Sequence, residues 1–296
     1  MKLSLFSVSY AGFWGQQALD LSAFIQKSAE LGYDAVMLAG KRPHVSPLDA
    51  NPESLLAIKN ALQKHQLTCS VIAGYTDLGP IAATEVPHLE LQIAYVESLS
   101  RIAAALGADI VRVFTAYEVD GHSPQAIWGN VVRTLQEMCD RAAGHGVTLA
   151  VQNHHDIAVH TDSLLELLAD IDRPNCKVGF DAWSPALRGE DLYTTAKQMA
   201  SHAAITTNAD YIRLPRFRYE PALVNYRPAT PDLVRAVKFG EGFIDYEAFF
   251  RGLVDGGFQG IANYEMCSPI RGGGSQENLD AYAQHYVHWM QSHGLV

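Results

Sequence analysis

Three places in the sequence put acid or imidazole side chains just after short apolar runs. His154 and His155 follow the run 147–151 by a few residues, Asp181 follows 177–180 and Glu265 follows 261–264. If these runs are strands of one parallel barrel, the three groups meet at its C-terminal mouth. Buried carboxylates are costly unless they are paired or bind a cation. A divalent ion is therefore the simplest interpretation, and carboxylates with an amide or imidazole suit Mn²⁺, Mg²⁺, Co²⁺ or Zn²⁺.

Each of these groups also has a structural explanation. Asp181, just before Ser184, can cap a helix. Glu265 can pair with an arginine, and 154–156 can be a solvated turn. The joint appearance of all three groups at equivalent depth favours the cation site.

Other side chains near these positions are candidate contacts to a substrate. Trp14 and Trp183 offer flat faces for stacking on a sugar, although packing at the mouth explains them equally well. Arg112, Arg213 and Arg216 are the candidate cations for binding a substrate, and either of the last two can hold a hydroxyl or a phosphate.

A recurring unit positions these residues: an amphipathic helical stretch, a glycine, and a short apolar strand. The pattern predicts strands near 3–8, 35–38, 68–73, 110–114, 147–151, 177–180, 204–214 and 261–264. It predicts helices near 18–31, 51–65, 87–106, 123–145, 160–170, 189–203, 245–256 and 275–292. Eight such units in 296 residues favour one α/β domain over 1–296, a (β/α)8 TIM barrel. No glycine-rich fingerprint after the first strand supports an open doubly wound sheet.

One stretch, 215–242, interrupts this rhythm and reads as a long loop after the seventh strand. Its aromatic residues favour an ordered lid or a contact in a homo-oligomer.

The composition limits the kinds of partner that this chain is expected to bind. The chain has 32 acidic and 22 basic residues, a net charge of −10, which argues against nucleic acid. No apolar run is long enough to cross a membrane, and the N-terminus reads as a first strand rather than a signal peptide. The four cysteines are far apart, without zinc spacing, as in reduced cytoplasmic proteins. We expect a cytoplasmic enzyme that acts on a small-molecule substrate.

The C-terminal third carries a family pattern. Gly-Glu-Gly-Phe-Ile-Asp-Tyr at 240–246, Gly-Phe-Gln-Gly at 257–260 and Tyr264-Glu265 resemble the signature of the xylose isomerase-like TIM-barrel family, which includes the AP endonuclease family 2 proteins. The resemblance implies a metal ligand on each of strands five to eight, commonly Glu, Asp, His and Glu. Asp181 and Glu265 match this set. Gln152 replaces the first Glu and is expected to bind the metal through its carbonyl oxygen. Asn208 is the expected ligand on strand seven, with Thr207 less favoured.

The resemblance implies a divalent-metal-dependent sugar isomerase or epimerase. Such an enzyme moves protons beside the carbonyl of a small sugar, keto-sugar or cyclitol through a metal-stabilised enediolate. Gln152 cannot act as a base, so His154 becomes the second acid/base group beside Glu265.

This exchange leaves room for a lyase or dehydratase acting on a 3-keto-glycoside or keto-inositol, with His154 as base. A catalytically silent binding barrel is the alternative from another class. An endonuclease IV-like phosphodiesterase is disfavoured, because His44 is nearly the only extra candidate ligand.

Overall fold

The computed structural model describes residues 1–79 and 86–296. Within them, eight parallel strands close into a barrel in the order β1-β10-β7-β6-β5-β4-β3-β2. These strands are β1 (Lys2–Phe6), β2 (Ala35–Ala39), β3 (Thr68–Ala73), β4 (Ile110–Val113), β5 (Thr148–Gln152), β6 (Cys176–Gly179), β7 (Ala203–Asn208) and β10 (Ile261–Tyr264). The predicted TIM barrel is confirmed.

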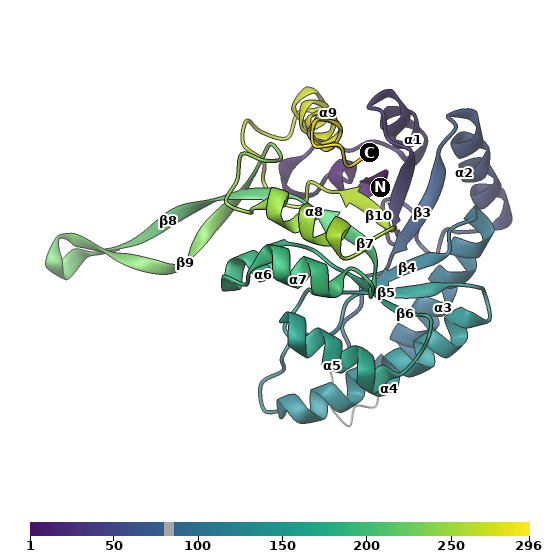
Figure 1. Cartoon of the computed structure of the whole chain (residues 1–296), viewed down its shortest axis with the longest axis horizontal. Helices are drawn as coiled ribbons and strands as arrows, with labels where there is room; N and C mark the ends of the chain where they lie inside the picture. Colours follow the sequence, from purple (N-terminus) through teal and green to yellow (C-terminus); the bar gives the residue numbers. More distant parts are fainter. Residues whose placement is uncertain (80–85) are drawn as a thin grey trace.

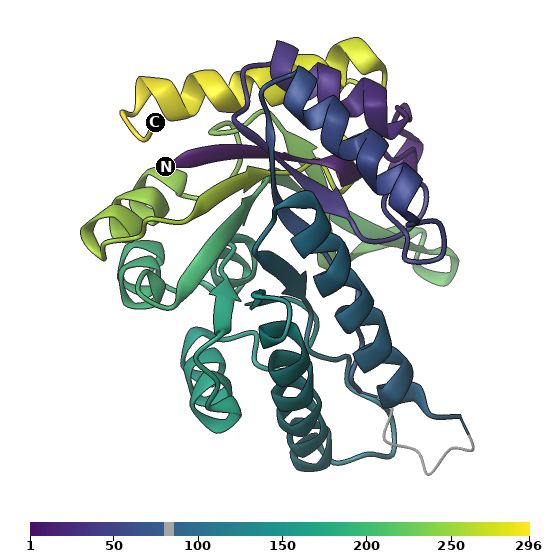
Figure 2. The ribbon, with the colours of Figure 1, turned by 90° about the vertical axis from the view of Figure 1, so that its right-hand side faces the viewer.

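Helices surround the barrel, as Figure 1 and Figure 2 show from two sides. They are α1 (Leu21–Glu30), α2 (Pro52–Lys64), α3 (His88–Leu106), α4 (Pro124–Ala143), α5 (Thr161–Ile171), α6 (Trp183–Arg188), α7 (Leu192–Met199), α8 (Tyr246–Asp255) and α9 (Gln276–Ser292). No helix of the described residues is long and apolar enough to cross a membrane.

Local sequence sets where several helices begin and end. Asn51 and Ser54 form a capping box at the start of α2, and the Ser123 side chain caps α4. Helix α3 ends at Gly107, whose φ of +78° is the left-handed conformation that glycine adopts at little cost. Strand β4 follows three residues later, so the helix–glycine–strand pattern has a direct structural cause.

The strands are buried on both faces and therefore contribute to two apolar layers. Inside the barrel, Phe6, Met37, Val71 and Ile205 pack together. Outside it, alternate strand residues such as Leu5 and Val178 pack against the helices. This two-sided burial explains why the strands read as continuous apolar runs.

The structure corrects the expected loop at 215–242. The seventh barrel strand ends at Asn208, and an antiparallel hairpin follows, made of β8 (Asp210–Glu220) and β9 (Asn225–Val237). Figure 1 shows that this hairpin, here called the arm (residues 210–237), projects far from the barrel. The stretch predicted as one strand at 204–214 therefore contains the end of β7 and the start of β8.

At the base of the arm, Asp210 binds the segment that follows β9. Oδ2 of Asp210 accepts the backbone N–H groups of Gly240 (2.9 Å) and Gly242 (2.8 Å). A Cβ atom at Gly242 would collide with this carboxylate, so only glycine fits. The Gly-Glu-Gly motif thus has a structural role beside the mouth.

The two chain ends meet at the N-terminal end of the barrel. The ammonium group of Met1 donates a hydrogen bond to the carbonyl of Leu295 (2.7 Å), beside the start of β1. All four cysteines lie in the described residues and are free thiols.

Candidate active site

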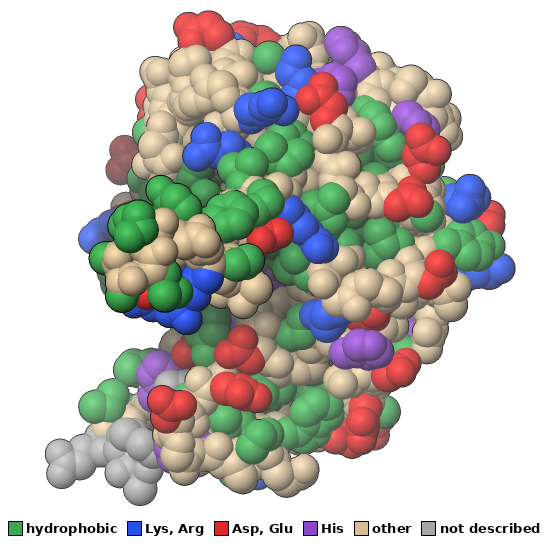
Figure 3. Space-filling model, turned by 90° about the vertical axis from the view of Figure 1, so that its left-hand side faces the viewer, with side chains coloured by type: hydrophobic (Ala, Val, Ile, Leu, Met, Phe, Trp, Pro, Cys, Tyr) green, Lys and Arg blue, Asp and Glu red, His purple; other side chains and the backbone are tan. Residues whose placement is uncertain are grey.

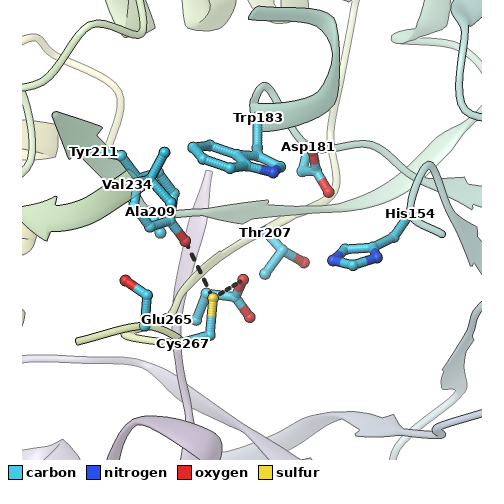
Figure 4. Close-up of a pocket in the computed structure, with 10 residues that line it drawn as sticks. His154, Asp181, Trp183, Thr207, Ala209, Tyr211, Val234, Glu265 and Cys267 are labelled. Carbon is cyan, nitrogen blue, oxygen red and sulfur yellow. Dashed lines mark hydrogen bonds between the residues drawn. The ribbon is translucent and has the colours of Figure 1, made fainter. Parts of the chain in front are cut away.

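A pocket of about 170 Å³ lies at the C-terminal ends of β5, β6, β7 and β10, and the base of the arm forms one wall. Figure 4 shows the side chains that point into it. They are His154, Asp181, Trp183, Thr207, Ala209, Tyr211, Val234, Glu265, Cys267 and Ser268. The structure therefore brings His154, Asp181 and Glu265 to one site, as the sequence predicts.

Asp181 is held rigidly just after β6. Nε2 of Gln152 donates to its Oδ2 (2.9 Å), and the backbone N–H of Ser184 donates to its Oδ1 (3.3 Å). The Asn153 amide hydrogen-bonds both backbone groups of Asp181 (2.9 and 2.8 Å). Burial raises the pKa of Asp181, while His154 and the bond from Gln152 oppose the rise. The carboxylate thus helps to cap α6 as well as lining the pocket.

Glu265 follows β10 and is the second carboxyl group of the pocket. Sγ–H of Cys267 donates to its Oε1 (3.0 Å), and the hydroxyl of Tyr211 lies 3.2 Å from that sulfur. Burial raises the pKa of Glu265 to about 7, although Cys267 and the charge of Arg112 lower it. No arginine of the described residues forms an ion pair with Glu265. It is therefore poised to gain and lose a proton near neutral pH.

The two neighbouring histidines have different surroundings. His154 lines the pocket, and its Nδ1 accepts the backbone N–H of His155 (2.8 Å). The neutral ring therefore carries its proton on Nε2, on the side that faces the pocket in Figure 4. Desolvation lowers the pKa of His154 below its usual value, which keeps the ring neutral at pH 7.

His155 is not part of the pocket lining; its ring stacks on Tyr117 (4.0 Å between ring centroids), and its Nδ1 lies 3.0 Å from Nδ1 of His154. Burial and the neighbouring His154 lower its pKa to about 4. The sequence left open which of the two histidines faces the site, and the structure places His154 there.

Thr207, rather than Asn208, is the side chain of β7 that faces the pocket. Nδ2 of Asn208 donates to the carbonyl of Asn263 (3.0 Å) and to the hydroxyl of Tyr286 on α9 (3.1 Å). The Asn208 amide, predicted as a ligand, is therefore engaged with β10 and α9 and is not part of the pocket lining. Oγ1 of Thr207 is buried and has no hydrogen-bond partner in the described residues, so it is free for a bound molecule.

Four other predicted contacts lie outside the pocket lining. Arg112 is buried in the barrel, stacked on Phe114 (3.9 Å). Trp14 lies in a turn after β1 and is 46% exposed. Arg213 stacks on Phe243 (4.1 Å), and Arg216 donates to the carbonyl of Pro231 on the arm (3.0 Å). Trp183 does line the pocket, where its ring packs on Tyr211 (4.2 Å).

Sequence reasoning missed five pocket residues: Ala209, Tyr211, Val234, Cys267 and Ser268. Cys267 stands two residues after Glu265, so an alternating backbone gave a signal for it. Tyr211 and Val234 are brought in by the arm, which was expected to be a loop.

Comparisons with known proteins agree with this architecture. The family model for a xylose isomerase-like TIM barrel matches residues 25–293. The 3-dehydroshikimate dehydratase of Bacillus anthracis is 22% identical over 264 residues, covering 86% of this chain and 88% of the relative. The fructoselysine 3-epimerase of Escherichia coli O157:H7 is also 22% identical over 264 residues, covering 85% of this chain and 87% of the relative.

Solved structures show the same fold. A probable 3-DHS dehydratase involved in petrobactin synthesis from Bacillus anthracis superposes with a TM-score of 0.75 at 19% identity, covering 98% of this chain and 99% of the other. A D-allulose 3-epimerase from Methylomonas sp. in complex with D-allulose gives a TM-score of 0.72 at 14% identity, covering 99% and 97%.

Proposed function

Since the chain belongs to the xylose isomerase-like TIM-barrel family, and its relatives include epimerases and a dehydratase, we propose that it moves protons beside a carbonyl group. The substrate class is a small sugar, keto-sugar or cyclitol. The main observation that supports this proposal is that His154, Asp181 and Glu265 line one pocket together with the unpartnered hydroxyl of Thr207. Trp183 supplies an apolar face on which a sugar ring can stack.

In the proposed mechanism, ionised Glu265 takes the proton from the carbon next to the carbonyl. Negative charge then develops on the carbonyl oxygen. Nε2–H of His154 and the hydroxyl of Thr207 donate hydrogen bonds to that oxygen, as preorganised donors do in other sites. This makes His154 a donor rather than the base expected from the sequence.

The fate of the enediolate decides the reaction class. Return of the proton from Glu265 to the neighbouring carbon gives isomerisation. Protonation of the same carbon from the face opposite Glu265, for which Asp181 is the proposed donor, gives epimerisation; burial raises the pKa of Asp181. Loss of a hydroxyl from the next carbon, which takes up the proton held by Glu265 and leaves as water, gives dehydration.

The divalent cation implied by the family resemblance does not fit these residues. The amide N–H of Gln152 is directed at Asp181, and Asn208 faces α9. No group of three or more His, Cys, Asp or Glu side chains suited to a metal occurs in the residues the structure describes. Asp181, Glu265 and the neutral imidazole of His154 share the pocket but do not form such a group, so we derive no step through a cation.

Replacing Gln152 with Glu should create a metal site that the wild-type residues do not form. The new carboxylate would face Asp181, and repulsion between them would lower the thermal stability without metal. Mn²⁺ should restore it, with affinity about tenfold or more above wild type. Titration with Mn²⁺ by electron paramagnetic resonance checks this. Equal affinity in both proteins would show that a cation already binds well without a Glu at position 152.

A dehydratase or lyase is the second candidate, and Gln152 favours it. Epimerisation needs a proton carrier on each face of the carbon, and Gln152 removes one of the two that the family pattern supplies. A keto-glycoside or keto-inositol substrate would then lose a hydroxyl or alcohol next to the enediolate.

The test of the proposed function is a deuterium-exchange screen in D₂O over aldoses, ketoses, keto-glycosides and inososes, with and without Mn²⁺, Mg²⁺ or Co²⁺. Deuterium in a recovered or isomeric sugar supports an isomerase or epimerase, and an unsaturated product supports a lyase. Failure of every compound to exchange would favour the silent barrel.

The pH dependence of exchange should depend on Cys267. Exchange should rise with pH as Glu265 ionises, with an apparent pKa of about 7. The hydrogen bond from Cys267 lowers the pKa of Glu265, so Cys267→Ala should move the rise to higher pH. Cys267→Ser keeps a donor and should restore the wild-type profile. Identical profiles in all three proteins would remove Glu265 from this role.

A further inference from the structure

The arm exposes an unusual amount of apolar surface for a two-stranded ribbon. Phe217, Leu223, Val224 and Tyr226 are 63%, 74%, 79% and 65% exposed. In the described residues, β8 and β9 form a sheet of their own, apart from one bridge between Ala236 and Ile270. Isolated hairpins are only marginally stable in water, and exposed apolar surface marks contact sites. The outer part of the arm therefore has the character of a contact surface.

The charge of the arm indicates what that partner is. Five arginines against three acids give residues 210–237 a net charge of +2, which leaves −12 on the rest of the chain. Arg213, Arg216 and Arg218 are exposed. In the described part of the chain, no arginine of the arm pairs with an acid of the barrel. The arm is thus a basic, aromatic element attached to an acidic body.

A complementary surface lies on the same molecule, at the β3–β5 side of the barrel mouth. This acidic rim consists of Asp77, Glu118, Asp120 and Asp156. Backbone N–H groups link it: Tyr117 N–H donates to Asp77 (3.1 Å) and Glu118 N–H to Asp156 (2.9 Å). None of the four acids forms an ion pair within residues 1–79 and 86–296. Figure 3, which views the arm end-on, shows acidic side chains gathered below it, across a hollow.

We propose that the arm binds the acidic rim of a second copy of this chain. Each copy carries both surfaces, so two arms can be exchanged about a two-fold axis and the assembly closes as a dimer. The residues outside the arm carry a net charge of −12. A second copy is therefore a better match for the basic arm than an anionic polymer, which those residues would repel.

The exchange would also bear on the pocket. The base of the arm lines the pocket of its own chain through Tyr211 and Val234. The rim includes Asp156, two residues beyond His154. The arm of the second copy would therefore cover the β5 side of the mouth and help to exclude water.

The experiment measures mass by sedimentation velocity at micromolar concentration, which needs no substrate. The wild type should be a dimer. Glu118→Lys/Asp120→Lys should weaken the dimer at least tenfold, whereas Glu53→Lys/Glu166→Lys makes the same charge change on α2 and α5 and should not. Adding Arg216→Glu/Arg218→Glu to the rim variant should restore the dimer, which separates repulsion from misfolding.

Three outcomes would overturn the exchange: a monomeric wild type at every concentration, a dimer indifferent to the rim charges, or a rim variant that the arm charges do not rescue. Co-purification of nucleic acid with a monomer would assign the arm to a different partner. The mass measurement needs no substrate and the deuterium screen is run on the wild type, so the two ideas fail separately.

Discussion

Glu265→Gln is expected to lower kcat for deuterium exchange by about 10³-fold or more. The glutamine amide can still donate and accept hydrogen bonds, but it cannot take a proton from carbon. The measurement is the exchange rate at saturating substrate above pH 7, where wild-type Glu265 is largely ionised. Glu166→Gln on α5 is the matched control and should keep the wild-type rate.

Stability separates this loss from unfolding. The folded-state pKa of Glu265, about 7, lies above its ordinary value of 4.5. Its stabilising contribution is therefore complete below about pH 4.5 and is lost as pH rises through 7. Neutral Gln avoids this loss, so Glu265→Gln should be at least as stable as wild type at pH 8. A stable variant with full exchange would place the proton transfer elsewhere.

His154→Ala is expected to lower exchange by about 10²- to 10³-fold, the usual cost of one donor to a developing oxyanion. His154→Gln should recover part of the rate, because its amide nitrogen can take the place of Nε2–H. Exchange in D₂O and substrate binding by calorimetry, measured on both variants, separate a lost donor from lost affinity.

The comparison also decides between a donor and a base. A base lost at position 154 would leave the Gln and Ala variants equally inactive. His155→Asn is the control, since asparagine tolerates the φ of +71° found there and the ring of His155 faces Tyr117. Its exchange rate should stay within a few-fold of wild type.

The fold was accessible from the sequence because the strands are buried on both faces and glycine ends the helices. Helix α3 ends at Leu106, just before Gly107, and β4 covers the apolar run at 110–113, both almost as expected. Asp181 and Glu265 were accessible for the same reason. In a parallel barrel, the residues just after every strand lie at the same, C-terminal end of the barrel.

The sequence did not show which side chains near the end of β7 face the pocket. Both Thr207 and Asn208 are buried and polar, so no alternation of character tells which one faces the pocket. The answer depends on Tyr286, a residue 78 positions away that binds the Asn208 amide.

The arm was missed for a different reason. Its strands bury little against the barrel, and their many arginines and prolines read as a loop. Tyr211 and Val234 entered the pocket only through this unpredicted hairpin.

The hydrogen bond between Met1 and Leu295 has a practical consequence for engineering. Both ends lie at the N-terminal end of the barrel, opposite the pocket. A reporter fused at either end would stand clear of incoming molecules. A short bridge could even join the two ends into a ring without disturbing the entrance.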